Sequence, residues 1–241
     1  MQTFLNNISV KSLRDYRRVT VAISLAALIV AGCSGDDSSS NPVPVDPAGS
    51  GSQTLLVVAE VSGSDGGGGL FSTNFTATVT DVGALPVTGA AVVIQGPFGL
   101  VTLVEQGAGV YAAVRNDYTP GTYVLSVVRS TDQVTGVRVI APDIHSITSP
   151  TTTAAVTANQ PFDVVWTRTV AAQECWMETR DWQSLPQMDT GLITVPGSDN
   201  PPNNDQRIRL FRKNTQAPAG GLQGSEFNGR IRNSVEPIDV Q

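Results

Sequence analysis

The feature that most constrains the fold of this chain is a period of two in its hydrophobicity. Phe75, Ala77 and Val79 alternate with threonine through residues 75–80. Side chains of a β-strand point alternately to its two faces, so this pattern predicts a strand with one buried and one exposed face. The sequence also holds 23 Gly and 15 Pro, which favour turns between short strands. We therefore expect an all-β fold.

Apolar stretches bounded by turn residues predict six more strands between residues 54 and 142. They are residues 55–61, 90–95, 100–104, 110–114, 123–128 and 134–140. Seven short strands separated by regularly spaced turns are typical of an antiparallel β-sandwich.

The break Ala141-Pro142-Asp143 predicts a domain boundary, with a second sandwich over residues 143–241. Phe162, Val164 and Trp166 share one face of a predicted strand, and we expect Trp166 to anchor the core. The strands expected in this half are residues 144–148, 154–158, 161–168, 174–182, 191–195, 206–211, 227–232 and 235–240, and residues 196–205 are expected to form a long polar loop.

Three segments of the first half carry a family resemblance. Residues 86–92 (PVTGAAV), 109–111 (GVY) and 118–125 (YTPGTYVL) resemble bacterial immunoglobulin-like modules, and also filamin-type and carboxypeptidase regulatory-like modules. The resemblance covers about residues 54–142 and implies a β-sandwich without catalytic residues. On chemical grounds, Tyr123 is expected to bury its ring while its hydroxyl reaches a backbone partner.

The N-terminal segment has the features of an export signal. Basic residues precede an apolar run, residues 19–30, which is shorter than the roughly 20 residues of a permanent transmembrane helix. Residues 30–33 (VAGC) resemble the lipobox of bacterial lipoproteins. This resemblance implies that residues 1–32 are a signal peptide that is removed, and that Cys33 carries palmitate-type acyl chains. An ordinary signal peptide and an uncleaved membrane anchor are the alternatives.

Residues 33–53 are rich in Ser, Gly, Pro and Asp, and this composition predicts a flexible tether. In the lipoproteins of Gram-negative envelopes, an aspartate directly after the acylated cysteine usually retains the protein in the inner membrane. Ser34 stands at that place here, so the resemblance favours the outer membrane, with a Gram-positive membrane as the alternative. The expected location is the bacterial cell envelope, with the membrane contacted through the N-terminal lipid.

The charge balance argues against nucleic acid as a partner. The chain has 15 Lys+Arg and 21 Asp+Glu. Loss of the signal peptide removes four basic residues and Asp15, which leaves 11 basic against 20 acidic side chains. Phosphate backbones require a basic surface.

The inventory of reactive side chains favours a protein that is not an enzyme. If Cys33 is acylated, Cys175 is the one remaining cysteine, and we expect it to be a small buried apolar residue. His145 is the single histidine, and no further motif surrounds it, so neither a cysteine nucleophile with a base nor a zinc site is expected. We expect no cofactor and no metal. Asp65 and the polar segments 198–200 and 203–205 could supply calcium ligands, but Asp and Asn are also ordinary turn residues.

Two clusters are candidate binding surfaces. Arg207 and Arg209 share one face of a predicted strand, as do Arg230 and Arg232, and Arg212 and Lys213 follow the first pair. If the two strands are neighbours, the arginines form a cationic stripe that can hold phosphate or carboxylate groups. A solvated face balanced by acidic residues of another strand is the alternative; these are Glu174, Glu178 and Asp181.

Trp176 and Trp182 are expected on the same side of the predicted strand 174–182. Exposed tryptophans can stack on sugar rings, whereas core or interface packing is the alternative. The leading hypothesis is a lipid-anchored envelope protein with non-catalytic immunoglobulin-like modules, acting as a structural spacer or protein-interaction module. The alternative is a surface adhesin or glycan-binding module that uses the two tryptophans and the arginine stripe.

Overall fold

The computed structural model describes residues 47–66 and 69–241, and this part of the chain is all-β. Its one helical element is a 3₁₀ turn, η1 (Gly197–Asp199). Across these two ranges, no helix has the length and apolar character needed to cross a membrane. The predicted signal peptide, Cys33 and most of the predicted tether lie outside the described residues.

The strands alternate buried and exposed side chains over most of their lengths. They are β1 (Ser50–Gly51), β2 (Leu55–Asp65), β3 (Phe71–Asp81), β4 (Ala91–Gly96), β5 (Gly99–Gly107), β6 (Val110–Arg115), β7 (Gly121–Arg129), β8 (Asp132–Ala141), β9 (Ser146–Ser149), β10 (Phe162–Thr167), β11 (Glu174–Glu178), β12 (Leu192–Val195), β13 (Asn203–Gln216) and β14 (Glu226–Val240). All seven strands expected before residue 142 are present, and the predicted alternation of residues 75–80 is confirmed in β3.

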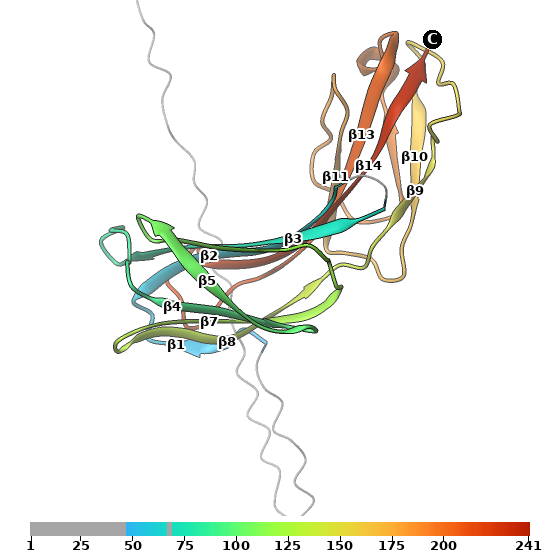
Figure 1. The fold of residues 1–241 in the computed structure, drawn as a ribbon. Coiled ribbons are helices and arrows are strands. Elements are labelled where there is room, and N and C mark those ends of the chain that lie inside the picture. The colour runs from blue at the N-terminus through green and yellow to red at the C-terminus, as the bar shows by residue number, and fades with distance from the viewer. Residues whose placement is uncertain (1–46, 67–68) are drawn as a thin grey trace, which may run out of the picture. The chain divides into compact units, whose positions relative to one another are not determined.

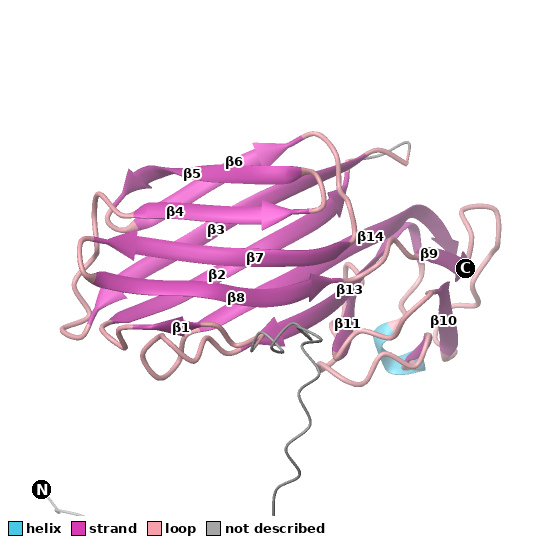
Figure 2. Cartoon of the chain, turned by 90° about the horizontal axis from the view of Figure 1, so that it is seen from below, coloured by secondary structure: helices cyan, strands magenta, loops and turns pink. Residues whose placement is uncertain are grey.

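The first hydrophobic core lies between two layers of strands (Figures 1 and 2). One layer has the order β1-β8-β7-β4-β5, and the other continues as β5-β6-β3-β2-β14. β5 takes part in both, because its first half pairs with β4 and its second half pairs with β6. Tyr123 is fully buried in this core, and its hydroxyl donates to the carbonyl oxygen of Thr119 at 2.6 Å. The expectation for this tyrosine is thus confirmed.

The second core lies between β11-β13-β14 and a small antiparallel sheet of order β12-β10-β9. Val164 and Trp166 of β10 face Met177, Ile208 and their neighbours in this core. Trp166 is only 4% exposed, as expected of a core anchor.

The hairpin β13–β14 connects the two cores. Phe227 and Ile231 of β14 pack in the first core, whereas Ile238 and Val240 pack in the second. The first half of β14 pairs with β2, and this pairing is parallel, in contrast to the antiparallel pairing expected throughout. A strand of the second segment thus completes the first core. The division into modules 54–142 and 143–241 stays a prediction.

Several local expectations need correction. Residues 227–232 and 235–240 form one strand instead of two. Residues 154–158 form no strand and contribute one parallel bridge, Val156 to Val240. The expected polar loop 196–205 is shorter, since Asn203 already pairs in β13. The expected tether 33–53 also ends earlier: Ser50 and Gly51 pair with β8, where a Cβ on Gly51 would lie 2.1 Å from the carbonyl oxygen of Gln133.

Candidate functional site

The two arginine-bearing strands are neighbours, and their side chains share one face of the sheet. In the antiparallel register of β13 and β14, Arg209 lies opposite Ser234, Phe211 opposite Arg232 and Lys213 opposite Arg230. Directly opposed residues project to the same face. The cationic stripe was expected if the two strands were neighbours, and their pairing brings these side chains together. We call this surface, formed by Trp176, Arg207, Arg209, Phe211, Arg230 and Arg232, the arginine face.

An aromatic pair lies in the middle of the arginine face. Trp176 of β11 is opposite Phe211 of β13, and their rings stack with centroids 4.9 Å apart and an interplanar angle of 1°. The guanidinium carbon of Arg230 lies 5.8 Å from the centroid of the Phe211 ring, within the range of a cation–π contact. Phe211, which the sequence did not single out, links the tryptophan to the arginines.

Part of the positive charge is neutralised by carboxylates of neighbouring strands. Arg230 Nη2 lies 2.8 Å from Glu60 Oε1, and Lys213 Nζ lies 2.6 Å from Glu174 Oε1. At this end of the face, acidic residues of neighbouring strands therefore neutralise the basic side chains. Glu174 is one of the acidic residues expected to do so.

At the other end of the face, three arginines form no ion pair with the described residues. No carboxylate of the described residues lies within 4 Å of the guanidinium nitrogens of Arg207, Arg209 or Arg232. The Nε atoms of Arg207 and Arg232 are buried without a hydrogen-bond partner. Burial lowers the pKa of Arg232, and the positive charges of Arg209 and Arg230 lower it further.

A cavity of about 390 Å³ opens beside Arg209 and Arg232. Arg209, Arg232 and Ser234 line one side of it, and Asp65 and Glu236 are the carboxylates in its wall. Gly66, Thr152 and Val235 complete the lining. The cavity thus joins the end of the β2–β3 hairpin to the middle of β14.

Trp182 does not lie on the arginine face. β11 ends at Glu178, and the chain turns where the Thr179 hydroxyl accepts hydrogen bonds from the backbone N–H groups of Asp181 and Trp182. Trp182 packs against the second core, together with Cys175 and Met177, which alternate with Trp176 along β11. The expectation that both tryptophans share one side of a strand is therefore not met, because the chain reverses between them.

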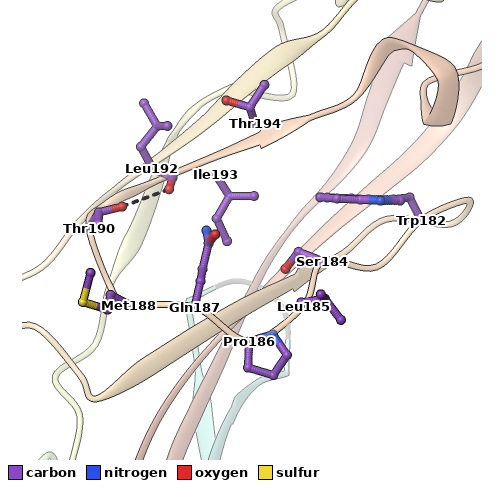
Figure 3. A pocket seen from close by; sticks show the side chains of 10 residues that line it. All are labelled: Trp182, Ser184, Leu185, Pro186, Gln187, Met188, Thr190, Leu192, Ile193 and Thr194. Carbon is purple, nitrogen blue, oxygen red and sulfur yellow. Dashed lines mark hydrogen bonds between the residues drawn. The ribbon is translucent and has the colours of Figure 1, made fainter.

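Trp182 instead lines a groove of about 670 Å³ along β12 (Figure 3). Leu185 and Met188 border this groove and are 85% and 77% exposed. Its other lining residues are Ser184, Pro186, Gln187, Thr190, Leu192, Ile193 and Thr194.

Arg212 leaves the cationic stripe and is fully buried on the opposite side of β13. Its Nε lies 2.7 Å from Asp189 Oδ2, and its Nη1 lies 3.0 Å from Asp143 Oδ1. Asp189 also accepts a hydrogen bond from Trp166 Nε1 at 3.1 Å and pairs with Arg168 Nε at 3.2 Å. The position of Arg212 on the opposite side was predictable, because an odd number of positions separates it from Arg209 along the strand. Nothing in the sequence marked Asp189 as its partner.

The two candidate reactive side chains are buried. Burial raises the pKa of the Cys175 thiol to about 12, and it lowers the pKa of His145 to about 4 with a further contribution from Arg212. A thiol with such a pKa is a poor nucleophile at neutral pH. Both side chains are fully buried.

The polar loops hold structural contacts. Asn200 Nδ2 donates to the carbonyl oxygens of Thr157 and Gln160, and Asp205 pairs with Arg180 at 2.9 Å. Within residues 47–66 and 69–241, no group of three or more His, Cys, Asp or Glu side chains is placed to hold a metal ion.

Comparisons with known proteins give no family. No family model matches the chain, and no curated protein matches it. Among solved structures, it is similar to the fibronectin(III)-like modules of Clostridium thermocellum CbhA, with 14% identity, 78% of this chain and 94% of that chain covered, and a TM-score of 0.28.

Two further similarities are of the same kind. The Yersinia pseudotuberculosis adhesin InvE is 19% identical over 78% of this chain and 60% of that chain, with a TM-score of 0.25. The BSP domain of a biofilm associated protein is 11% identical over 76% of this chain and 30% of that chain, with a TM-score of 0.24. Similarities of this strength carry no functional argument, and the fold description rests on the strand pairing itself.

Proposed function

We propose that the protein is a non-catalytic, lipid-anchored component of the bacterial cell envelope, in which the β-sandwich cores serve as a spacer or as a protein-interaction module. The observation that carries this proposal is β14, which completes both cores with one continuous strand. A hydrogen-bonded strand shared by two cores resists their separation better than a loop does. The burial of Cys175 and His145 supports a role without nucleophilic or acid–base chemistry.

The anchoring half of the proposal rests on residues 30–33 and on the apolar run before them. Each acyl methylene buried in the membrane stabilises the attachment by about 0.8 kcal/mol, and two or more chains give stable attachment. Acylation of Cys33 would hold the folded residues at the membrane through the polar segment that follows, with the outer membrane as the proposed site.

Membrane fractionation of a Cys33→Ser variant tests the anchor. The native protein is expected in the membrane fraction and labelled by palmitate, and the variant is expected to lose both properties. Cys175→Ser is the matched control, because it removes the other cysteine and should leave both unchanged. A Cys33→Ser variant that still sediments with membranes and still incorporates palmitate would refute the anchor.

A second candidate function is that of a surface adhesin or glycan-binding module, and the row Trp176–Phe211–Arg232 across three strands favours it. An aromatic surface beside guanidinium groups can stack on a sugar ring and bind its polar substituents. Trp182 lies elsewhere and is left out of this surface.

A glycan array separates the binder from the spacer. Binding that is lost in Trp176→Ala and kept in Leu185→Ala would support the glycan function, since Leu185 is an exposed apolar side chain away from the arginine face. No binding to any glycan would leave the spacer as the proposed function.

A further inference from the structure

We infer that the cavity beside Arg209, Arg232 and Ser234 binds the oxyanion group of an acidic saccharide. This inference deepens the second proposed function and rests on it, because it assigns the charge of the ligand and the residues that contact it. The ligand group is a carboxylate or sulfate carried on a sugar ring.

The first argument is the set of unpaired donors. Arg232 lines the cavity and holds a buried Nε without a hydrogen-bond partner, and its Nη2 donates to the backbone oxygen of Asp65 at 3.5 Å. Buried donors in folded proteins are almost always hydrogen-bonded, and an exception calls for an explanation. An oxyanion in the cavity would supply acceptors for guanidinium groups that the described residues leave without a carboxylate.

The second argument is the electrostatic potential. Burial is the main cause that lowers the pKa of Arg232. The positive charges of Arg209, Arg230 and Arg207 lower it further, whereas Asp65 raises it. The surroundings of Arg232 therefore carry a surplus of positive charge, and a bound anion would relieve it.

The carboxylates in the cavity wall restrict the charge of the ligand that the site can bind. Asp65 and Glu236 line the cavity, and Glu178 lies opposite Arg209 on β11. These groups would repel a ligand that carries several clustered charges. The site thus suits a single oxyanion, with Glu236 as a group that weakens binding.

The third argument identifies a saccharide as the carrier of the charge. β14 pairs with β13 on one side and, as far as Arg232, with β2 on the other, so the backbone at Arg232 is already paired on both sides. Trp176 lies in the same cross-strand row as Arg232, so a sugar ring could contact the aromatic pair while its acidic group reaches the arginines.

The size of the cavity agrees with this ligand. A volume of about 390 Å³ lies within the range of about 300–1,000 Å³ found for small-molecule sites. The hydroxyls of Ser234 and Thr152 would add neutral donors beside the guanidinium groups.

The test is a titration of the full-length protein in detergent with three probes: digalacturonate, its methyl ester and inorganic sulfate. The ester keeps the rings and removes the charge. We expect digalacturonate to bind at least tenfold more tightly than its ester, with an affinity that falls as NaCl is raised. Arg232→Gln and Arg209→Gln should each weaken digalacturonate binding at least tenfold, and Glu236→Gln should strengthen it.

Arg129→Gln is the matched control, because Arg129 is an exposed arginine on β7 and its removal should change nothing. Thermal unfolding of each variant checks that it is folded, and Arg209→Gln provides a second test should Arg232→Gln fail to fold.

The possible outcomes separate the site from the proposed function. Equal binding of digalacturonate and its ester would retain a glycan-binding protein and overturn the oxyanion site. Arginine-dependent binding of sulfate, with digalacturonate no tighter than sulfate, would overturn the saccharide assignment. Absence of any arginine-dependent binding of digalacturonate or sulfate would overturn the inference altogether.

Discussion

Arg212 and Asp189 form a fully buried ion pair, with 2.7 Å between Arg212 Nε and Asp189 Oδ2 and both side chains 0% exposed. The pair joins β13 to the segment before β12, and Arg212 also contacts Asp143 directly after the first core. Charges taken out of water are tolerated only when their partners are in place. The region between the two cores therefore depends on this contact.

Asp189→Asn should destabilise the protein strongly. Removing one partner of a buried pair leaves an uncompensated charge, which typically costs about 3–5 kcal/mol. Urea unfolding followed by tryptophan fluorescence measures this loss, because Trp166 Nε1 donates to Asp189. Asp117→Asn is the control, since Asp117 pairs with Arg115 on the surface and should have little effect. An Asp189→Asn protein as stable as the native one would show that the pair is not structural.

Phe227→Ala should lower the stability of both cores together. Phe227 is fully buried in the first core, whereas all three tryptophans lie between residues 166 and 182. Truncation of a buried Phe typically costs about 3–5 kcal/mol. Because β14 belongs to both cores, the unfolding midpoint seen by tryptophan fluorescence should fall, although the substitution is in the other core.

Ile238→Ala on the same strand is the positive control, since Ile238 packs in the second core. If Phe227→Ala left the tryptophan transition unchanged while lowering the midpoint seen by circular dichroism, the cores would unfold independently and the shared strand would not couple them.

The first core was predictable from local pattern, whereas β14 was not. Residues 75–80 alternate visibly, and Tyr123 sits in a turn-rich motif whose burial follows from its chemistry. The parallel pairing of β14 with β2 joins residues far apart in the sequence; Arg230 and Ser62 are 168 positions apart. No local signal encodes such a partner, so the sequence indicated two short strands where the structure has one continuous strand.

The arginine face was predictable only in part. Alternation placed Arg207 with Arg209 and Arg230 with Arg232, and strand pairing then brought the two pairs together. The same alternation places Arg212 on the face opposite Arg209, so its absence from the stripe was also predictable. The reversal at Thr179 could not be recognised, because a hydroxyl accepting two backbone N–H groups has no distinctive sequence pattern.

Acid should destabilise the fold between pH 6.5 and about 4 through His145. Its pKa is lowered to about 4 in the folded protein, against about 6.5 when unfolded. As the pH falls through this window the unfolded state binds a proton that the folded state excludes, so the free energy of unfolding declines by up to about 1.4 kcal/mol per pH unit. Urea unfolding at several pH values measures the slope.

His145→Gln should remove that slope, since glutamine does not titrate. The lowered pKa of Asp143 adds to the loss of stability only below about pH 5, so the slope between pH 6.5 and 5 is the part that belongs to His145. A native protein with a flat stability profile from pH 6.5 to 4 would contradict the assignment.

Cys175 should be unreactive in the folded protein. Its thiol is fully buried with a pKa raised to about 12, so the thiolate is scarce at pH 8. In a Cys33→Ser background, a thiol-reactive disulfide reagent should modify Cys175 only after denaturant is added. Rapid stoichiometric modification without denaturant would place this thiol at an accessible site.

Mass spectrometry of the protein isolated from its native membrane tests the central claim most directly. The account predicts that the chain begins at Cys33 and that this residue carries fatty acyl chains. A free Cys33 thiol in a chain that still contains residues 1–32 would contradict it.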